Sequence, residues 1–186
     1  MRSVFDIPKF SADFEQLAAV ALNPERHSAP NALVHSQQVA ERAAELGRLN
    51  GCTAAEVELL RNLGLVHDIG KITGTANPSA SVDLLPSYGL TDPAFVELVK
   101  CHDTNLPWWI AVRRGQPPSD KAWRKLAARV DMKLLSLFMV ADRVDYPGGC
   151  RANQALVWFL DECRRRQLVH IDALVLDLEP APEGTP

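Results

Sequence analysis

Hydrophobic residues recur every three or four positions along most of the chain, whereas no stretch alternates convincingly with period two. The first spacing is typical of amphipathic helices and the second of half-buried strands. One helical face is easily read after Pro30, where it consists of Ala32, His35, Val39, Ala43 and Leu46. The pattern therefore predicts an all-α protein that folds as a compact multi-helix bundle.

Capping and helix-breaking residues predict where these helices begin and end. Thr53-Ala54-Ala55-Glu56 is a capping box, in which hydroxyl and carboxylate satisfy each other's backbone donors. Ser28-Ala29-Pro30 is expected to open a helix, because the missing N–H of proline does no harm in the first turn. Helices are expected over residues 11–22, 30–49, 53–69, 92–102, 119–130, 131–145 and 151–168. Residues 71–90 are expected to be loop with at most a short helix at 79–85, and residues 107–118 to be irregular or a short helix.

The length of 186 residues is suited to one domain, which we expect over residues 1–178. Hydrophobic residues make up 47% of the chain and charged residues 23%, which is ordinary for a globular protein with a real core. Residues 179–186 contain three prolines and little that could be buried. We therefore expect this tail to be disordered.

Charge and hydropathy limit the class of partner. The formal net charge of −3 disfavours a dedicated nucleic-acid-binding protein, which is normally basic. No apolar run approaches the ~20 residues that span a bilayer, so no membrane partner is expected. The first residues lack the apolar core of a signal peptide, which predicts a cytoplasmic location. A monomer and a homodimer both stay open.

Each candidate site residue carries limited information when it is taken alone. A single histidine on an apolar face, such as His35, is most often a hydrogen-bonded core residue. Asp142 is more informative, because it follows Leu135 by seven residues and so lies on a buried helical face. A buried carboxylate is costly unless it is paired. Either a metal ion or an arginine, Arg143 or Arg129, would meet this need.

Taken together, the candidates point to one shared ion. Separate helical faces place metal-binding groups where the core should be, and these groups are His35, His67 with Asp68, His102, and Asp142. Two imidazoles and two carboxylates suit an octahedral divalent ion such as Mn, Fe, Co, Ni or Mg. Such an ion polarises a phosphoryl oxygen and activates water near neutral pH.

The order of these residues resembles the HD-domain superfamily of metal-dependent phosphohydrolases. The resemblance is carried by His35, then His67-Asp68-Ile69-Gly70-Lys71, then Ala141-Asp142-Arg143, and it extends over roughly residues 31–145. It implies a helical bundle with the metal at its centre, bound by His35, His67, Asp68 and Asp142. It also implies hydrolysis of a phosphomonoester or phosphodiester, often of a nucleotide, by metal-activated water.

The resemblance also suggests roles for residues around the metal. Asp68 could orient or deprotonate the attacking water. Lys71 is expected to contact phosphate, although a solvated loop lysine is the alternative, and Arg143 either to contact phosphate or to brace Asp142. Family members with two metals use further histidines after the Gly-Lys pair, and residues 72–90 contain none. We therefore expect one metal, with His102 as a hydrogen-bond donor to the substrate phosphate or as a general acid. A two-metal site that includes His102 is the alternative.

The remaining aromatic residues and histidines divide into two groups. Trp108 and Trp109 follow His102 closely, so Trp108 is expected to wall the pocket and stack on a nucleobase, with core packing as the alternative. His27 and His170 lie outside the motif and are expected at the surface or in packing.

The expected substrate is a small phosphoester, foremost a nucleotide. Two other functions stay open. One is a non-catalytic ligand-sensing or protein-interaction module, and the other is a cyclic phosphodiesterase with an RNA-related role.

Overall fold

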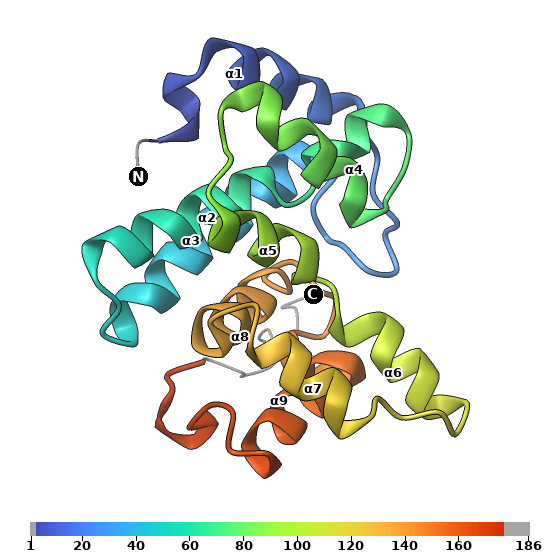
Figure 1. Ribbon diagram of the computed structural model, residues 1–186. Coiled ribbons are helices and arrows are strands. Elements are labelled where there is room, and N and C mark those ends of the chain that lie inside the picture. The colour runs from blue at the N-terminus through green and yellow to red at the C-terminus, as the bar shows by residue number, and fades with distance from the viewer. Residues whose placement is uncertain (1–2, 177–186) are drawn as a thin grey trace.

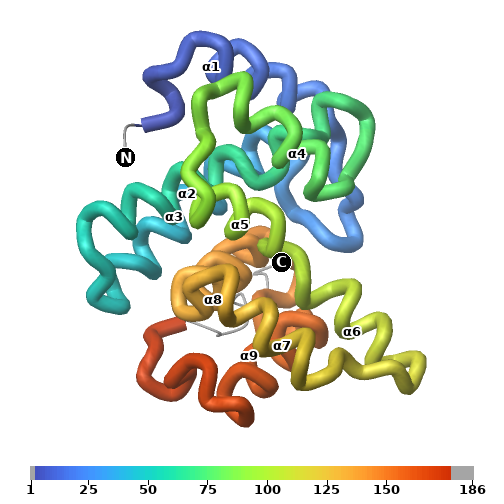
Figure 2. Tube along the Cα trace, in the orientation of Figure 1, coloured from blue at the N-terminus to red at the C-terminus, as the bar shows by residue number. Residues whose placement is uncertain are grey.

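Helices account for the regular structure of the computed structural model, which describes residues 3–176 (Figures 1 and 2). The α-helices are α1 (Pro8–Glu15), α2 (Ala32–Leu49), α3 (Ala54–Val66), α4 (Pro78–Leu84), α5 (Pro93–Cys101), α6 (Asn105–Arg113), α7 (Asp120–Ala127), α8 (Met132–Ala141) and α9 (Gln154–Arg165). Short 3₁₀ turns are η1 (Val4–Asp6), η2 (Gln16–Ala19), η3 (Ile69–Thr73), η4 (Leu85–Tyr88), η5 (Cys150–Ala152) and η6 (Ile171–Ala173). The predicted all-α bundle is confirmed. The predicted tail, 179–186, lies outside the described residues.

Several predicted caps are present in the structure. The Thr53–Glu56 capping box is complete, and the Asp92 side chain accepts a hydrogen bond from Phe95 N at the start of α5. Gly51 follows α2 with a φ of +64°, a conformation that glycine adopts without the steric cost of a side chain. These local signals set the beginning of α3 and α5 and the end of α2.

The N-terminal region differs from the prediction. The first α-helix begins at Pro8 rather than Ser11, because proline fixes the φ angle that the first helical turn needs. The α-helix ends at Glu15 and does not continue to residue 22. Further on, Ala21 forms an isolated antiparallel β-bridge with Asn31.

The start of α2 also differs from the prediction, which places it too early. The Asn31 side chain accepts from Val34 N at 3.0 Å and caps the helix, so Pro30 precedes the cap instead of occupying the first turn. Residues 71–90 contain more helix than expected, namely α4 and the flanking η3 and η4, and residues 105–113 form the regular helix α6.

The helices α2 and α3 pack along each other, and α2 also packs against α8 (Figure 1). The approach of α2 to α3 is close because Gly64 has no side chain; a Cβ there would lie 2.4 Å from Ala40 Cα. His67 follows Gly64 by about one turn, on a helix held tightly against the one that carries His35. Among the described residues, no helix is both long and apolar enough to cross a membrane.

Candidate metal centre

The candidate site lies where three helices end against α2. His67, His102 and Asp142 are the first residues beyond α3, α5 and α8, and each is buried. The C-terminus of a helix carries unpaired carbonyl groups and a partial negative charge, which attracts cations. The fold therefore directs three negative helix ends towards a small group of metal-binding side chains.

The four side chains predicted as metal ligands meet at this point. Asp142 Oδ1 lies 3.2 Å from His35 Nε2 and 3.2 Å from His67 Nε2. Asp68 Oδ2 lies 3.3 Å from His67 Nε2 and 3.8 Å from His35 Nε2. Ligand atoms of His35, His67 and Asp68 all lie within 4.8 Å of one another. Two imidazole nitrogens and two carboxylates thus face a common centre.

The hydrogen bonding of His67 indicates that a cation fits this centre. Its Nδ1 donates to the carbonyl of Gly64 at 2.8 Å, so a neutral ring has its lone pair on Nε2. That Nε2 atom is buried without a hydrogen-bond partner and faces the carboxylates of Asp68 and Asp142. A lone pair against two carboxylates is unfavourable unless a proton or a cation lies between them. The donor set suits a divalent cation.

Without a cation, protons satisfy the same arrangement. Burial alone lowers the pKa of His67, but the carboxylates of Asp68 and Asp142 outweigh this effect and raise the pKa to about 10. Burial opposes ionisation of Asp68, yet His67 and Lys71 hold the pKa of that carboxyl far below its ordinary value. The centre therefore keeps its carboxylates charged and requires positive charge beside them.

Two cationic side chains lie against the predicted ligands. Arg143 is buried, with its guanidinium donating to the Asp142 carboxylate and, at 3.2 Å, to Asp103 Oδ1. It is therefore the arginine that braces Asp142, whereas the alternative partner Arg129 pairs with Glu97. Lys71 Nζ lies 2.6 Å from Asp68 Oδ2. Its side chain is only 14% exposed, which contradicts the alternative of a solvated loop lysine.

The structure also brings His102 to the site. Its ring centroid lies 5.2 Å from that of His67, and its Nδ1 donates to the carbonyl of Val99 at 2.6 Å. Burial, and then the charge of His67, lowers the pKa of His102. In the neutral ring, Nε2 is consequently an acceptor, so the expected role as a proton donor requires a second proton on this ring.

Sequence reasoning missed two residues behind His35. Asp145 Oδ1 lies 3.1 Å from His35 Nδ1, and His27 Nδ1 lies 3.1 Å from Asp145 Oδ2. The His27 and His35 ring centroids are 4.7 Å apart. His27 thus packs, as one of the two expectations had it, but it packs against a predicted ligand and lines the site cavity, which the sequence reasoning did not foresee. Asp145 could have been found, because it follows Asp142 by three residues; His27 lies in an irregular segment that gives no such signal.

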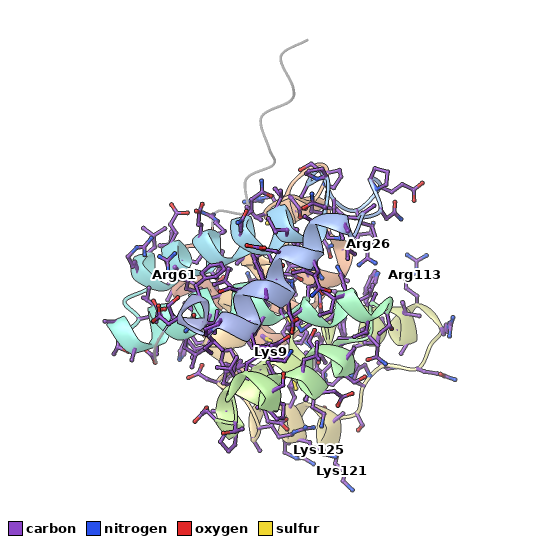
Figure 3. The ribbon with its side chains drawn as sticks, turned by 90° about the horizontal axis from the view of Figure 1, so that it is seen from above. Lys9, Arg26, Arg61, Arg113, Lys121 and Lys125 are labelled. Atoms are coloured by element: carbon purple, nitrogen blue, oxygen red, sulfur yellow. The ribbon has the colours of Figure 1, made fainter. Side chains whose placement is uncertain are left out.

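A small polar cavity of about 80 Å³ opens over the site. It is lined by Arg26, His27, His35, His67, Asp68, Lys71, Ala76, Pro78, His102, Asp103, Asp142 and Arg143. A cavity of about 310 Å³ shares Arg26, His27, Lys71 and Ala76 with it, and another of about 450 Å³ shares Pro78 and Asp103. Figure 3 shows Arg26 at the molecular surface. An anion that approaches from this side meets Arg26 and Lys71 first.

The structure does not bring Trp108 to this cavity. Its ring packs 4.7 Å from Trp123 and 6.4 Å from Phe159, measured between centroids. The expectation that Trp108 walls the pocket is therefore wrong, because α6 turns this side chain towards α7 and α9. His170, the other histidine outside the motif, is exposed, as expected.

Comparison with known proteins agrees with this geometry. No curated protein and no solved structure matches the chain. One protein family, described as HD domain, matches residues 33–146, which is more than half of the chain and includes all four predicted ligands. Members of this family are mostly metal-dependent phosphohydrolases. The chain belongs to the HD domain family.

Proposed function

We propose that this protein is a metal-dependent phosphohydrolase that acts on a nucleotide or a related small phosphoester. The observation that carries the proposal is the buried His67 Nε2, which has no hydrogen-bond partner and faces two carboxylates. His35, His67, Asp68 and Asp142 would together bind one divalent ion, of the Mn, Fe, Co, Ni or Mg type. When bound there, such an ion polarises a phosphoryl oxygen and lowers the pKa of a water molecule.

Asp68 and Lys71 would work as a pair during hydrolysis. The Asp68 carboxylate faces both His67 and the Lys71 ammonium, so it is well placed to accept a proton from the attacking water. Lys71 lines the cavity, and its positive charge would hold the phosphate beside this carboxylate. Arg26, on the same side of the cavity, would supply a second contact to the phosphate.

His102 and Arg143 also line the cavity and would assist the reaction. A phosphate next to His102 favours the doubly protonated ring, because a negative charge raises the pKa of a nearby imidazole. In that state Nε2 donates to the phosphate or to the leaving oxygen, while Nδ1 stays bonded to Val99 O. Arg143 would hold Asp142 in place through the contact already present, with any contact to phosphate as an addition.

The proposal is tested by metal analysis together with a panel of phosphomonoesters and phosphodiesters. We expect about one divalent ion per chain and hydrolysis that stops when the ion is removed. Asp142→Asn should lose metal and turnover while the protein still folds. The matched control is Glu97→Gln, which breaks the Arg129–Glu97 ion pair outside the cavity and should keep both.

Two results would contradict the proposal. The first is a wild-type protein that neither contains nor binds a divalent ion. The second is an Asp142→Asn variant that keeps its metal and loses only stability, by the roughly 3–5 kcal/mol typical of a broken buried ion pair. In that case Asp142 would be a structural partner of Arg143 alone.

A further inference from the structure

The two nitrogens of the His35 ring face different groups. Nε2 faces Asp142 Oδ1 and the candidate metal centre, whereas Nδ1 lies 3.1 Å from Asp145 Oδ1. Both His35 and Asp145 are buried, with 1% and 5% of their surface exposed. Asp145 is thus a second carboxylate for this ring, on the side away from the metal centre.

Asp145 is itself fixed by the segment that precedes α2. Its carboxylate lies 3.1 Å from His27 Nδ1 and accepts a long hydrogen bond, 3.4 Å, from Ala29 N. Its backbone carbonyl accepts from Ser28 N at 2.8 Å. Residues 27–29 are therefore attached to the turn after α8 through Asp145, and they hold its carboxylate against His35.

A carboxylate at this place determines which nitrogen of His35 is available. A neutral imidazole has one N–H and one lone pair, and the hydrogen bond made by one nitrogen decides the state of the other. In this structure, Nδ1 makes no well-aligned hydrogen bond, and Nε2 contacts Asp142 Oδ1 at 3.2 Å. When a cation takes the lone pair of Nε2, the ring proton must lie on Nδ1, where the Asp145 carboxylate is 3.1 Å away and can accept it. A carboxylate in this position also makes the ring a more basic ligand and fixes its orientation.

We propose that Asp145 is a positioning residue for His35, and that His27 positions Asp145 in turn. The inference rests on the proposed function in one respect, namely that Nε2 of His35 binds a cation. It adds two residues that act through His35 without touching the cation. It also gives the irregular segment before α2 a role in metal affinity.

The same three side chains could in principle hold a second ion, since ligand atoms of His27, His35 and Asp145 lie within 4.8 Å of one another. That arrangement would require His35 to bind a cation through each nitrogen and hence to lose its ring proton. A neutral imidazole offers only one lone pair. The geometry therefore favours a proton between His35 and Asp145, with one cation on the other side of the ring.

The test measures metal affinity directly, without turnover. Mn²⁺ is the probe, because thiols compete weakly for this hard ion, and its free concentration is read by electron paramagnetic resonance. Asp145→Asn should weaken Mn²⁺ binding by about 10- to 100-fold, the usual effect of removing a carboxylate behind a histidine ligand. Asp13→Asn is the control, since that carboxylate pairs with Lys9 and Tyr88 and does not line the cavity, and its Mn²⁺ affinity should equal that of the wild type.

Two variants of His27 test whether this residue positions Asp145. His27→Gln keeps a side-chain N–H that can donate to Asp145, whereas His27→Ala keeps none. We expect His27→Ala to weaken Mn²⁺ binding and His27→Gln to restore most of the loss. Long-range ¹H–¹⁵N spectra of the wild type loaded with diamagnetic Zn²⁺ should show His35 protonated at Nδ1; this reading does not depend on whether Asp145→Asn folds.

Wild-type affinity in Asp145→Asn, or a proton on Nε2 of His35, would overturn the inference. A wild type that binds two ions, with one lost in His27→Ala, would overturn it in favour of a second metal site. The proposed function fails separately: if the affinities change as expected but no phosphoester is hydrolysed, Asp145 keeps its positioning role and the enzymatic role is lost.

Discussion

Replacing Gly70 with alanine would test how the metal centre depends on the packing of α4. A Cβ at this position would lie 2.3 Å from Ser81 N and 2.6 Å from Ala80 C. Non-bonded carbon atoms normally lie about 3.5–4.0 Å apart, so the two segments would have to separate by about 1 Å. Both obstacles are backbone atoms of α4, which no change of side-chain rotamer can move away.

The expected loss of stability has two parts. Overpacking a well-packed site costs about 1–3 kcal/mol. The hydrogen bond from Gly70 N to Ser81 Oγ, 2.9 Å long and buried, would lengthen or break, which removes a further 0.5–1.5 kcal/mol or so. We expect Gly70→Ala to lower the free energy of unfolding by about 1.5–4.5 kcal/mol. Because Gly70 lies between Asp68 and Lys71, a displacement of about 1 Å should also reduce turnover about 100-fold.

Urea denaturation and steady-state hydrolysis measure these two effects, and Gly74→Ala is the matched control. Gly74 has a φ of +82°, and a Cβ added there would have no atom within 4 Å, so its replacement introduces only backbone strain of about 1–2 kcal/mol. It should retain most of the turnover. If Gly70→Ala is as stable as Gly74→Ala and equally active, the packing of η3 against α4 does not position the metal centre.

Three further predictions concern the site and its surroundings. His102→Ala should reduce turnover about 100-fold while metal content stays near one ion per chain; metal loss in step with activity would make His102 a ligand. The metal-free protein should lose stability as pH rises from 6.5 to 10. Folding raises the pKa of His67 from 6.5 to about 10, so the charged imidazole stabilises the fold fully below pH 6.5 and this stabilisation is lost as pH rises to about 10. Denaturation with and without metal should show this loss only without metal. Thr53→Ala should remove the α3 cap and cost about 1 kcal/mol in the thermal melt, with unchanged metal affinity.

The sequence was most informative where a site residue continues a helical pattern. His35 and Asp142 occupy positions that hydrophobic spacing marks as buried, so their polarity was already a signal of an unusual environment. His67 follows a helix whose start was fixed by the capping box at Thr53. In each case local chemistry and helical geometry together determine where the side chain points, which is why the structure brings the predicted ligands together.

Contacts that depend on irregular backbone were not predictable in this way. His27 reaches Asp145 because residues 27–29 lie against the turn after α8, and no periodic pattern encodes that contact. The prediction for Trp108 is wrong for a related reason. This residue is close to His102 along the chain, but α6 directs its ring towards Trp123. Nearness in sequence predicts a shared site only when the intervening helix presents both side chains to the same side.

Charge balance at the site supports one divalent cation. The buried or half-buried charged groups there are four carboxylates and two permanent cations, namely Asp68, Asp103, Asp142, Asp145, Lys71 and Arg143. With the histidines neutral, the four negative and two positive charges leave an excess of two negative charges, which one divalent ion neutralises. The C-termini of α3, α5 and α8 add partial negative charge of the same sign. A second divalent ion would make the buried site positive before substrate arrives, whereas a single ion leaves the exposed Arg26 as the charge that attracts phosphate.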